Sequence, residues 1–152
     1  MRRRGFITVL GCVFSWPLAA YAQPTGKVPR IGLLWPGPSG PDPVIDAFSH
    51  GLRENGYIEG QNITVERVDA DFRPERFAPL AAELVHRNVD VIVVWSTSPA
   101  RAVKEATTTI PIVVNAMADP VRDGLVESLA RPGGNITGNT FLGLCLTTLP
   151  AT

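Results

Sequence analysis

The sequence predicts an α/β protein built on a doubly wound, five-stranded parallel sheet, and two observations support this fold class. Short apolar segments rich in Val and Ile alternate along the chain with segments whose apolar residues recur at helical spacing. Strands that alternate with helices of this length form parallel sheets with right-handed crossovers and helices on both faces. A chain of 152 residues has room for one such domain and hardly for two.

The first half of the chain supplies two expected strands and two expected helices. Residues 30–35 form a continuous apolar run, typical of a strand covered on both faces, and residues 62–68 alternate like a strand nearer the sheet edge. Between them, residues 44–52 place apolar side chains on one helical stripe, and Gly56 supplies the stop just beyond it. Residues 74–87 carry the second helical stripe.

The second half continues the alternation. Residues 89–95 are the most β-branched run in the chain and are expected to form a central strand. The remaining expected elements are a short helix over 100–107, a strand over 110–115, a helix over 121–130 and a fifth strand over 135–141. In the last helix, Leu125, Val126 and Leu129 are expected to face the core.

The first 22 residues are predicted to be a secretory signal peptide. Three arginines precede an apolar run too short to span a bilayer, and Ala22-Gln23 marks the expected cleavage site. The arginines fit a twin-arginine signal as well as an ordinary one, and both predict a periplasmic protein with no stable membrane insertion after cleavage. Lipoprotein processing at Cys12 is a third, disfavoured interpretation.

Composition argues against several classes of function. Removal of the signal leaves three more acidic than basic residues and no basic run, so no nucleic-acid partner is expected. Cys145 would then be the single cysteine, which excludes an internal disulfide. His50 and His86 are expected at the solvated surface, and the sequence holds no GxSxG elbow, HExxH or paired-cysteine spacing. We therefore expect no enzyme, metal or cofactor.

Ligands of such sheets bind outside the carboxyl ends of the strands, and this edge is marked three times. The dipeptides Asp42-Pro43, Ser98-Pro99 and Asp119-Pro120 follow the first, third and fourth strands. In each, a side-chain oxygen can cap a helix and proline pre-sets its first turn. The three dipeptides are also fully explained as ordinary helix caps.

Ser96 and Thr97 are different, because a helix needs only one cap. Their two hydroxyls, between a central strand and a helix N-terminus, predict a small anion site that suits a carboxylate. A phosphate would usually come with glycines or a lysine, and neither GxGxxG nor GxxxxGK[ST] occurs. Trp35 and Trp95 end two strands expected to be adjacent, where they either frame an aromatic ligand group or serve as core residues.

Four further stretches carry a family resemblance: GLRENGYIEGQNITVE (51–66), LAAELVHRNVDVIV (80–93), ATTTIPIVV (106–114) and DPVRDGLVESLARPGGNITG (119–138). With the signal sequence, they make the chain resemble the exported substrate-binding proteins of ABC transporters, of the tryptophan- or aromatic-amino-acid type. The resemblance implies one lobe of a type I periplasmic-binding fold, a small carboxylate-bearing ligand and an ABC transporter permease as partner.

The resemblance also implies which loops bind ligand, namely those after the first, third and fourth strands. The implied residues are Pro36, Gly37 and Ser39, then Ser96, Thr97 and Ser98, then Asn115 and Asp119. In this group of proteins, hydroxyls at the position of residues 96–98 would take the carboxylate of an amino acid.

One departure from the family pattern lies after Phe141. The chain reads LGLCLTTLPAT, where relatives continue into a charged helix and a second lobe. The expected domains are therefore a signal peptide over 1–22, a lobe over 23–141 and an atypical tail over 142–152. A frameshift or premature stop is the simplest account, and a genuine single-lobe protein is the other. A flavodoxin-like binding module and an exported α/β hydrolase are the alternative functions.

Overall fold

The structure, a computed structural model, describes residues 27–140. The expected signal peptide with its Ala22-Gln23 cleavage site lies outside the described residues, as do Cys12, Cys145 and the tail over 142–152.

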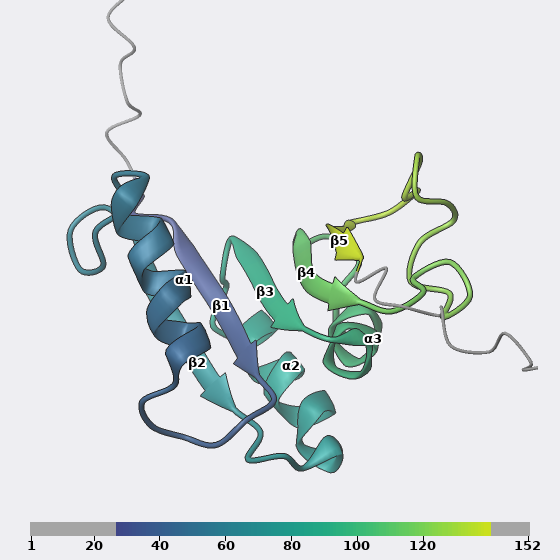
Figure 1. The fold of residues 1–152 in the computed structure, drawn as a ribbon, viewed down its shortest axis with the longest axis horizontal. Helices are drawn as coiled ribbons and strands as arrows, with labels where there is room; N and C mark the ends of the chain where they lie inside the picture. The colour runs from purple at the N-terminus through teal and green to yellow at the C-terminus, as the bar shows by residue number, and fades with distance from the viewer. Residues whose placement is uncertain (1–26, 141–152) are drawn as a thin grey trace, which may run out of the picture.

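The centre of the described region is a five-stranded sheet in the order β2-β1-β3-β4-β5, with every neighbouring pair parallel (Figure 1). The strands are β1 (Arg30–Trp35), β2 (Thr64–Asp69), β3 (Val91–Trp95), β4 (Ile112–Met117) and β5 (Ile136–Thr140). The predicted fold class is therefore confirmed. The pairing of β1 with β3 also confirms that the strands ending in Trp35 and Trp95 are neighbours.

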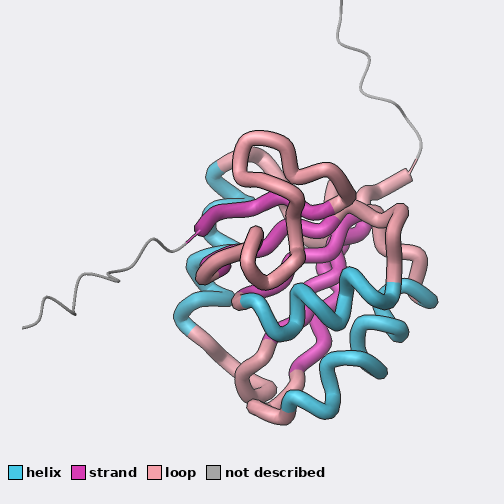
Figure 2. The backbone as a smooth tube through the Cα atoms, turned by 90° about the vertical axis from the view of Figure 1, so that its right-hand side faces the viewer, coloured by secondary structure: helices cyan, strands magenta, loops and turns pink. Residues whose placement is uncertain are grey.

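Helices lie on both sides of the strands (Figure 2). Helix α1 (Pro43–Glu54) packs Phe48 and Leu52 near the buried side chains of Ile31, Ile63 and Val93. A short 3-10 turn, η1 (Pro74–Arg76), leads into α2 (Phe77–His86), and α3 (Thr97–Ala106) packs beside α2. The placement of helices on both faces follows from right-handed crossovers. The connection from β1 to β2 runs in one direction along the sheet, and all later connections run in the other.

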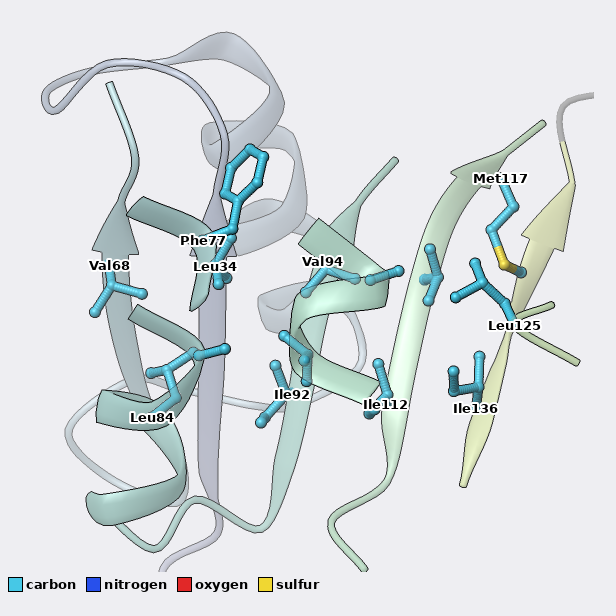
Figure 3. Close-up of a cluster of buried hydrophobic side chains, with 14 of the residues drawn as sticks. Leu34, Val68, Phe77, Leu84, Ile92, Val94, Ile112, Met117, Leu125 and Ile136 are labelled. Atoms are coloured by element: carbon cyan, nitrogen blue, oxygen red, sulfur yellow. The ribbon is translucent and has the colours of Figure 1, made fainter. Parts of the chain in front are cut away.

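The main core lies between the sheet and the α2–α3 layer (Figure 3). Period-two alternation turns one set of strand side chains toward these helices, and Leu34, Ile92, Val94 and Ile112 are fully buried there. From α2, Leu84 fills the same space and is also fully buried. Complete burial of such a side chain contributes about 1.5–3 kcal/mol, which makes this layer the main source of stability.

The helix expected over residues 121–130 does not form. The Asp123 N–H donates to the Asp119 carbonyl at 2.9 Å, which closes one turn, and Gly124 then takes a φ of 67° and ends it. Leu125 and Val126 are buried as predicted, whereas Leu129 is 63% exposed. The segment therefore buries two apolar side chains from irregular structure, without a helical stripe.

Candidate ligand-binding site

The carboxyl ends of β1, β3 and β4 meet at one edge of the sheet and bring most of the predicted site residues together. Trp95 at the end of β3 is the register partner of Asn115 in β4. The Ser96 N–H donates to the Asn115 carbonyl at 3.0 Å. Residues 96–98, called the hydroxyl corner below, and the carboxyl end of β4 are therefore direct neighbours, as the parallel topology predicts.

Ser96 is the N-cap of α3, but its side chain makes no capping hydrogen bond. The prediction that Ser98 caps this helix was wrong, because α3 begins at Thr97 and Ser98 is its second residue. Ser96 holds a φ of 74°, outside the extended range that capping residues normally adopt. The first-turn N–H groups of α3 therefore lack a cap from this side chain, and the hydroxyls of Ser96 and Ser98 lie at the exposed surface beside them.

The other two predicted cap positions behave differently. The Asp42 carboxylate accepts from the Val44 N–H at 2.8 Å and caps α1, as predicted. The Asp119 carboxylate accepts from the Arg122 N–H at 3.0 Å and so caps a single turn, not a helix. Among the three predicted cap positions, the N-terminus of α3 at Ser96 is therefore the one that lacks a side-chain cap.

The carboxyl end of β4, which includes Asn115, is shaped by a bulge. Pairing with β5 shifts register between Val114 and Met117, and Ala116 takes a φ of 62°. The Asn139 side chain accepts from the Ala116 N–H at 2.7 Å and so supports this strained residue. Asn139 was not among the predicted site residues, because its contact is 23 positions away in sequence.

An aromatic cluster lies beneath the hydroxyl corner. The rings of Trp35 and Trp95 meet edge to face with centroids 5.3 Å apart, and Phe48 of α1 meets Trp95 in the same way at 5.8 Å. Both indole N–H groups are buried, and neither has a hydrogen-bond partner within the described residues. Trp35 is only 8% exposed and so behaves as a core residue, whereas Trp95 is partly exposed.

The β1–α1 loop, residues 36–42, carries the predicted residues Pro36, Gly37 and Ser39. Gly37 lies against the Trp35 ring, since a Cβ added there would be 2.5 Å from the indole nitrogen. The Ser39 N–H donates to the Asp71 carboxylate at 3.1 Å, and this hydrogen bond is the main cause that lowers the pKa of Asp71. Asp71 follows β2, whose carboxyl end meets the same edge, and that topological argument could have found it.

The side chains that commonly bind metal ions are scattered over the described residues. No three His, Cys, Asp or Glu side chains between residues 27 and 140 gather closely enough to hold a metal ion. His50 and His86 are both exposed, and His50 lies 3.5 Å from the carboxylate of Glu54. Over the same residues, no helix has the length and apolar character needed to cross a bilayer.

Comparison with known proteins gives concordant results. A tyrosine-binding protein from Clostridioides difficile is 36% identical over 99 residues, which are 65% of this chain and 29% of that protein. The ligand-free, open structure of a substrate-binding protein with adhesive properties from Clostridium difficile aligns with a TM-score of 0.67 and 32% identity, over 74% of this chain and 39% of that one. An ABC domain from Streptococcus pneumoniae in complex with L-Trp aligns with a TM-score of 0.65 and 28% identity, over 75% of this chain and 39% of that one.

The chain spans less than two fifths of the length of these three relatives. Relatives described as binding proteins are not enzymes, which favours a binding function over the exported hydrolase considered above. The family model for ABC transporter substrate binding proteins matches residues 38–141, well over half of the sequence. The chain belongs to the ABC transporter substrate-binding protein family.

Proposed function

We propose that this chain is the ligand-binding lobe of an exported solute-binding protein that supplies an ABC importer with a small carboxylate-bearing ligand, an aromatic amino acid. The observation that carries the proposal is the helix N-terminus at Ser96, whose side chain makes no capping hydrogen bond. An uncapped first turn offers N–H donors and a partial positive charge, and the hydroxyls of Ser96, Thr97 and Ser98 add further donors. A carboxylate matches this arrangement.

The rest of the amino acid would meet the neighbouring loops. The Asp119 carboxylate is exposed at the same edge and suits the ligand's ammonium group, while Asn115 near the end of β4 lies beside the hydroxyl corner. The partly exposed Trp95 is the aromatic side chain best placed to contact an aromatic ligand, because Trp35 is covered by Gly37. Relatives that bind tyrosine or hold L-Trp support this ligand class.

Binding is tested by titrating the protein with L-tryptophan, L-tyrosine and L-phenylalanine while amide shifts are followed by NMR, which detects millimolar affinities. Shifts should concentrate at residues 96–98 and 115–119. Tryptamine and tyramine, which lack the carboxylate, should bind at least ten-fold more weakly, since a hydrogen bond to a charged group contributes about 1.5–3 kcal/mol. Equal affinity for tryptamine and L-tryptophan would exclude a carboxylate site.

Two substitutions separate binding from folding. Ser96→Gly removes the hydroxyl but suits the φ of 74°, so affinity should fall while stability is kept or raised. Thr97→Val removes a hydroxyl at nearly constant volume and should also weaken binding. Thr108→Val, an exposed position beyond the other end of α3, is the matched control and should leave affinity unchanged.

Export is the second part of the proposal and rests on the first 22 residues of the sequence. These residues, fused to a reporter that is active only outside the cytoplasm, should support export in a bacterial host. Replacement of Arg3 and Arg4 by lysine should block export if the route is the twin-arginine one and spare it if the signal is an ordinary one. A reporter retained in the cytoplasm with the native sequence would refute export by this segment.

A further inference from the structure

We propose that Arg67 in β2 and Asp71, two residues beyond the end of β2, are positioning residues that hold the β1–α1 loop in its ligand-binding form. This inference rests on the proposed function, because it assigns a role to residues that act through a predicted ligand loop. Neither residue belongs to the loops after β1, β3 and β4 from which the site was predicted.

Arg67 binds the loop with its guanidinium. Nη1 donates to the Gly40 carbonyl at 2.9 Å and Nη2 donates to the Pro38 carbonyl at 3.2 Å. Nε donates to the Asp69 carboxylate at 2.6 Å, which fixes the orientation of the planar group. The side chains of Arg67 and Asp69 are only 23% and 17% exposed, so water screens these contacts less than it screens ordinary surface pairs.

Asp71 binds the same loop through both its carboxylate and its backbone N–H. Its carboxylate accepts from both the N–H and the hydroxyl of Ser39, at 3.1 and 3.4 Å, and also pairs with Arg76. Asp71 and Phe72 take φ values of 52° and 57°. In this conformation their N–H groups donate to the carbonyls of Gly37 and Pro36, at 3.0 and 2.8 Å.

The loop is therefore held from outside and not by its own sequence. The carbonyls of residues 36, 37, 38 and 40 accept hydrogen bonds whose four donors all lie in residues 67–72, while the last loop residue, Asp42, caps α1. Three of the loop's seven residues are prolines, which have no N–H with which to close internal turns. A loop of this composition would sample many shapes without the contacts from Arg67 and Asp71.

Fixing the loop also fixes the floor of the proposed site. Gly37 lies directly on the Trp35 ring, and Trp35 packs edge to face against Trp95. The contacts from β2 therefore determine how far Gly37 and Ser39 stand from the hydroxyl corner at Ser96. A change in Arg67 should alter ligand affinity even though its own side chain is directed at the loop carbonyls.

The test compares Arg67→Met and Asp71→Ala with the matched control Arg87→Met. Arg87 likewise pairs with two carboxylates, those of Glu66 and Glu83, and its side chain is 38% exposed, but it contacts no part of the loop in these pairs. Asp71→Asn is the conservative variant, because its amide oxygen can still accept from Ser39. Each full-length variant is studied by NMR hydrogen exchange and by titration with L-tyrosine.

We expect Arg67→Met and Asp71→Ala to speed exchange of the amides at positions 39, 71 and 72 at least ten-fold relative to the β3 amides of Ile92 and Val94. Affinity for L-tyrosine should fall at least five-fold. Asp71→Asn should recover part of both losses, and Arg87→Met should change neither quantity.

Unchanged exchange at Ser39, Asp71 and Phe72 in Arg67→Met would overturn the claim that these residues hold the loop. Faster exchange with unaltered L-tyrosine affinity would overturn their role in binding. A wild-type protein that binds none of the aromatic amino acids would instead overturn the proposed function. The hydrogen-exchange rates alone would then decide whether Arg67 and Asp71 hold the β1–α1 loop.

Discussion

Replacement of Gly37 by alanine should lower the free energy of unfolding by about 1–3 kcal/mol, because the added methyl group has no space in a well-packed site. An ideal Cβ on Gly37 would lie 2.5 Å from Nε1 and 3.0 Å from Cε2 of Trp35. The Trp35 ring is 8% exposed and packs against Trp95, so it cannot swing aside without breaking that contact. Gly37 does not hold a positive φ, so the whole effect comes from the clash.

A double-mutant cycle isolates this clash. Urea unfolding followed by far-UV circular dichroism gives the free energy of unfolding for wild type, Gly37→Ala, Trp35→Phe and the double variant. Phenylalanine lacks the indole atoms that the methyl group would meet, so alanine at position 37 should cost at least about 1 kcal/mol less in the Trp35→Phe background. Gly51→Ala is the control, since it lies in helix α1 with open space around it and should stabilise by about 0.5–1 kcal/mol.

Two results would refute the reasoning. A cost of Gly37→Ala below about 0.5 kcal/mol would mean that the loop is not seated on the indole, or that it moves freely away from it. An equal cost in both backgrounds would mean that something other than the Trp35 ring opposes the methyl group. Either outcome would also weaken the proposal that the loop is held in one form by Arg67 and Asp71.

Three further predictions concern stability. Leu84→Ala should lower the urea-derived free energy of unfolding by about 2–5 kcal/mol, because Leu84 is fully buried between α2 and the sheet. Gly138→Ala should abolish protection of β5 amides in hydrogen exchange, since its Cβ would lie 1.9 Å from the Val114 carbonyl oxygen and its φ is 152°. Hydrogen bonds from Arg30 and then Arg87 lower the pKa of Glu66 below its ordinary 4.5, so the stability they supply is present above that pH and is lost as pH falls through the lowered value. The difference in urea midpoint between wild type and Glu66→Gln should therefore shrink as pH drops below 4.5, and a constant difference down to pH 3 would contradict this.

The strands were predictable because burial on both faces leaves a simple record in the sequence. β1 is apolar after Arg30 and β3 is apolar throughout and mostly β-branched, and both lie inside the sheet with neighbours on each side. The failure at residues 121–130 has a local cause. The spacing of the apolar residues correctly predicted that Leu125 and Val126 are buried. It did not determine the backbone conformation, because a compact loop that turns at Gly124 buries both side chains equally well.

The site was predictable only in part. The hydroxyls after a buried strand lie at a helix N-terminus on the carboxyl edge of the sheet, as the topology requires, and their role in ligand binding stays a prediction. The predicted cap, Ser98, was wrong because α3 begins at Thr97 and has Ser96 as its N-cap, at a φ of 74° that no local propensity predicts for serine. Arg67 was missed because its partners Pro38 and Gly40 lie 29 and 27 positions earlier in the chain.

The two ends of the sheet are stabilised by different means, and this difference supports the location of the site. Near the amino ends of the strands, Lys27 pairs with Asp90, while Arg30 and Arg87 share Glu66. Such exposed or half-exposed ion pairs each contribute little to the free energy of unfolding, and they connect neighbouring segments without strained backbone.

Within residues 27–140, five non-glycine residues hold a positive φ, and four of them, Asp71, Phe72, Ser96 and Ala116, lie at or just beyond the carboxyl ends of β2, β3 and β4. Each costs on the order of 1–3 kcal/mol and persists only where surrounding contacts impose it. A fold that needed only stability could place glycine at these positions. The strained residues instead lie together at one edge of the sheet, beside the N-terminus of α3, which the Ser96 side chain leaves uncapped. This arrangement is what a preformed ligand site requires.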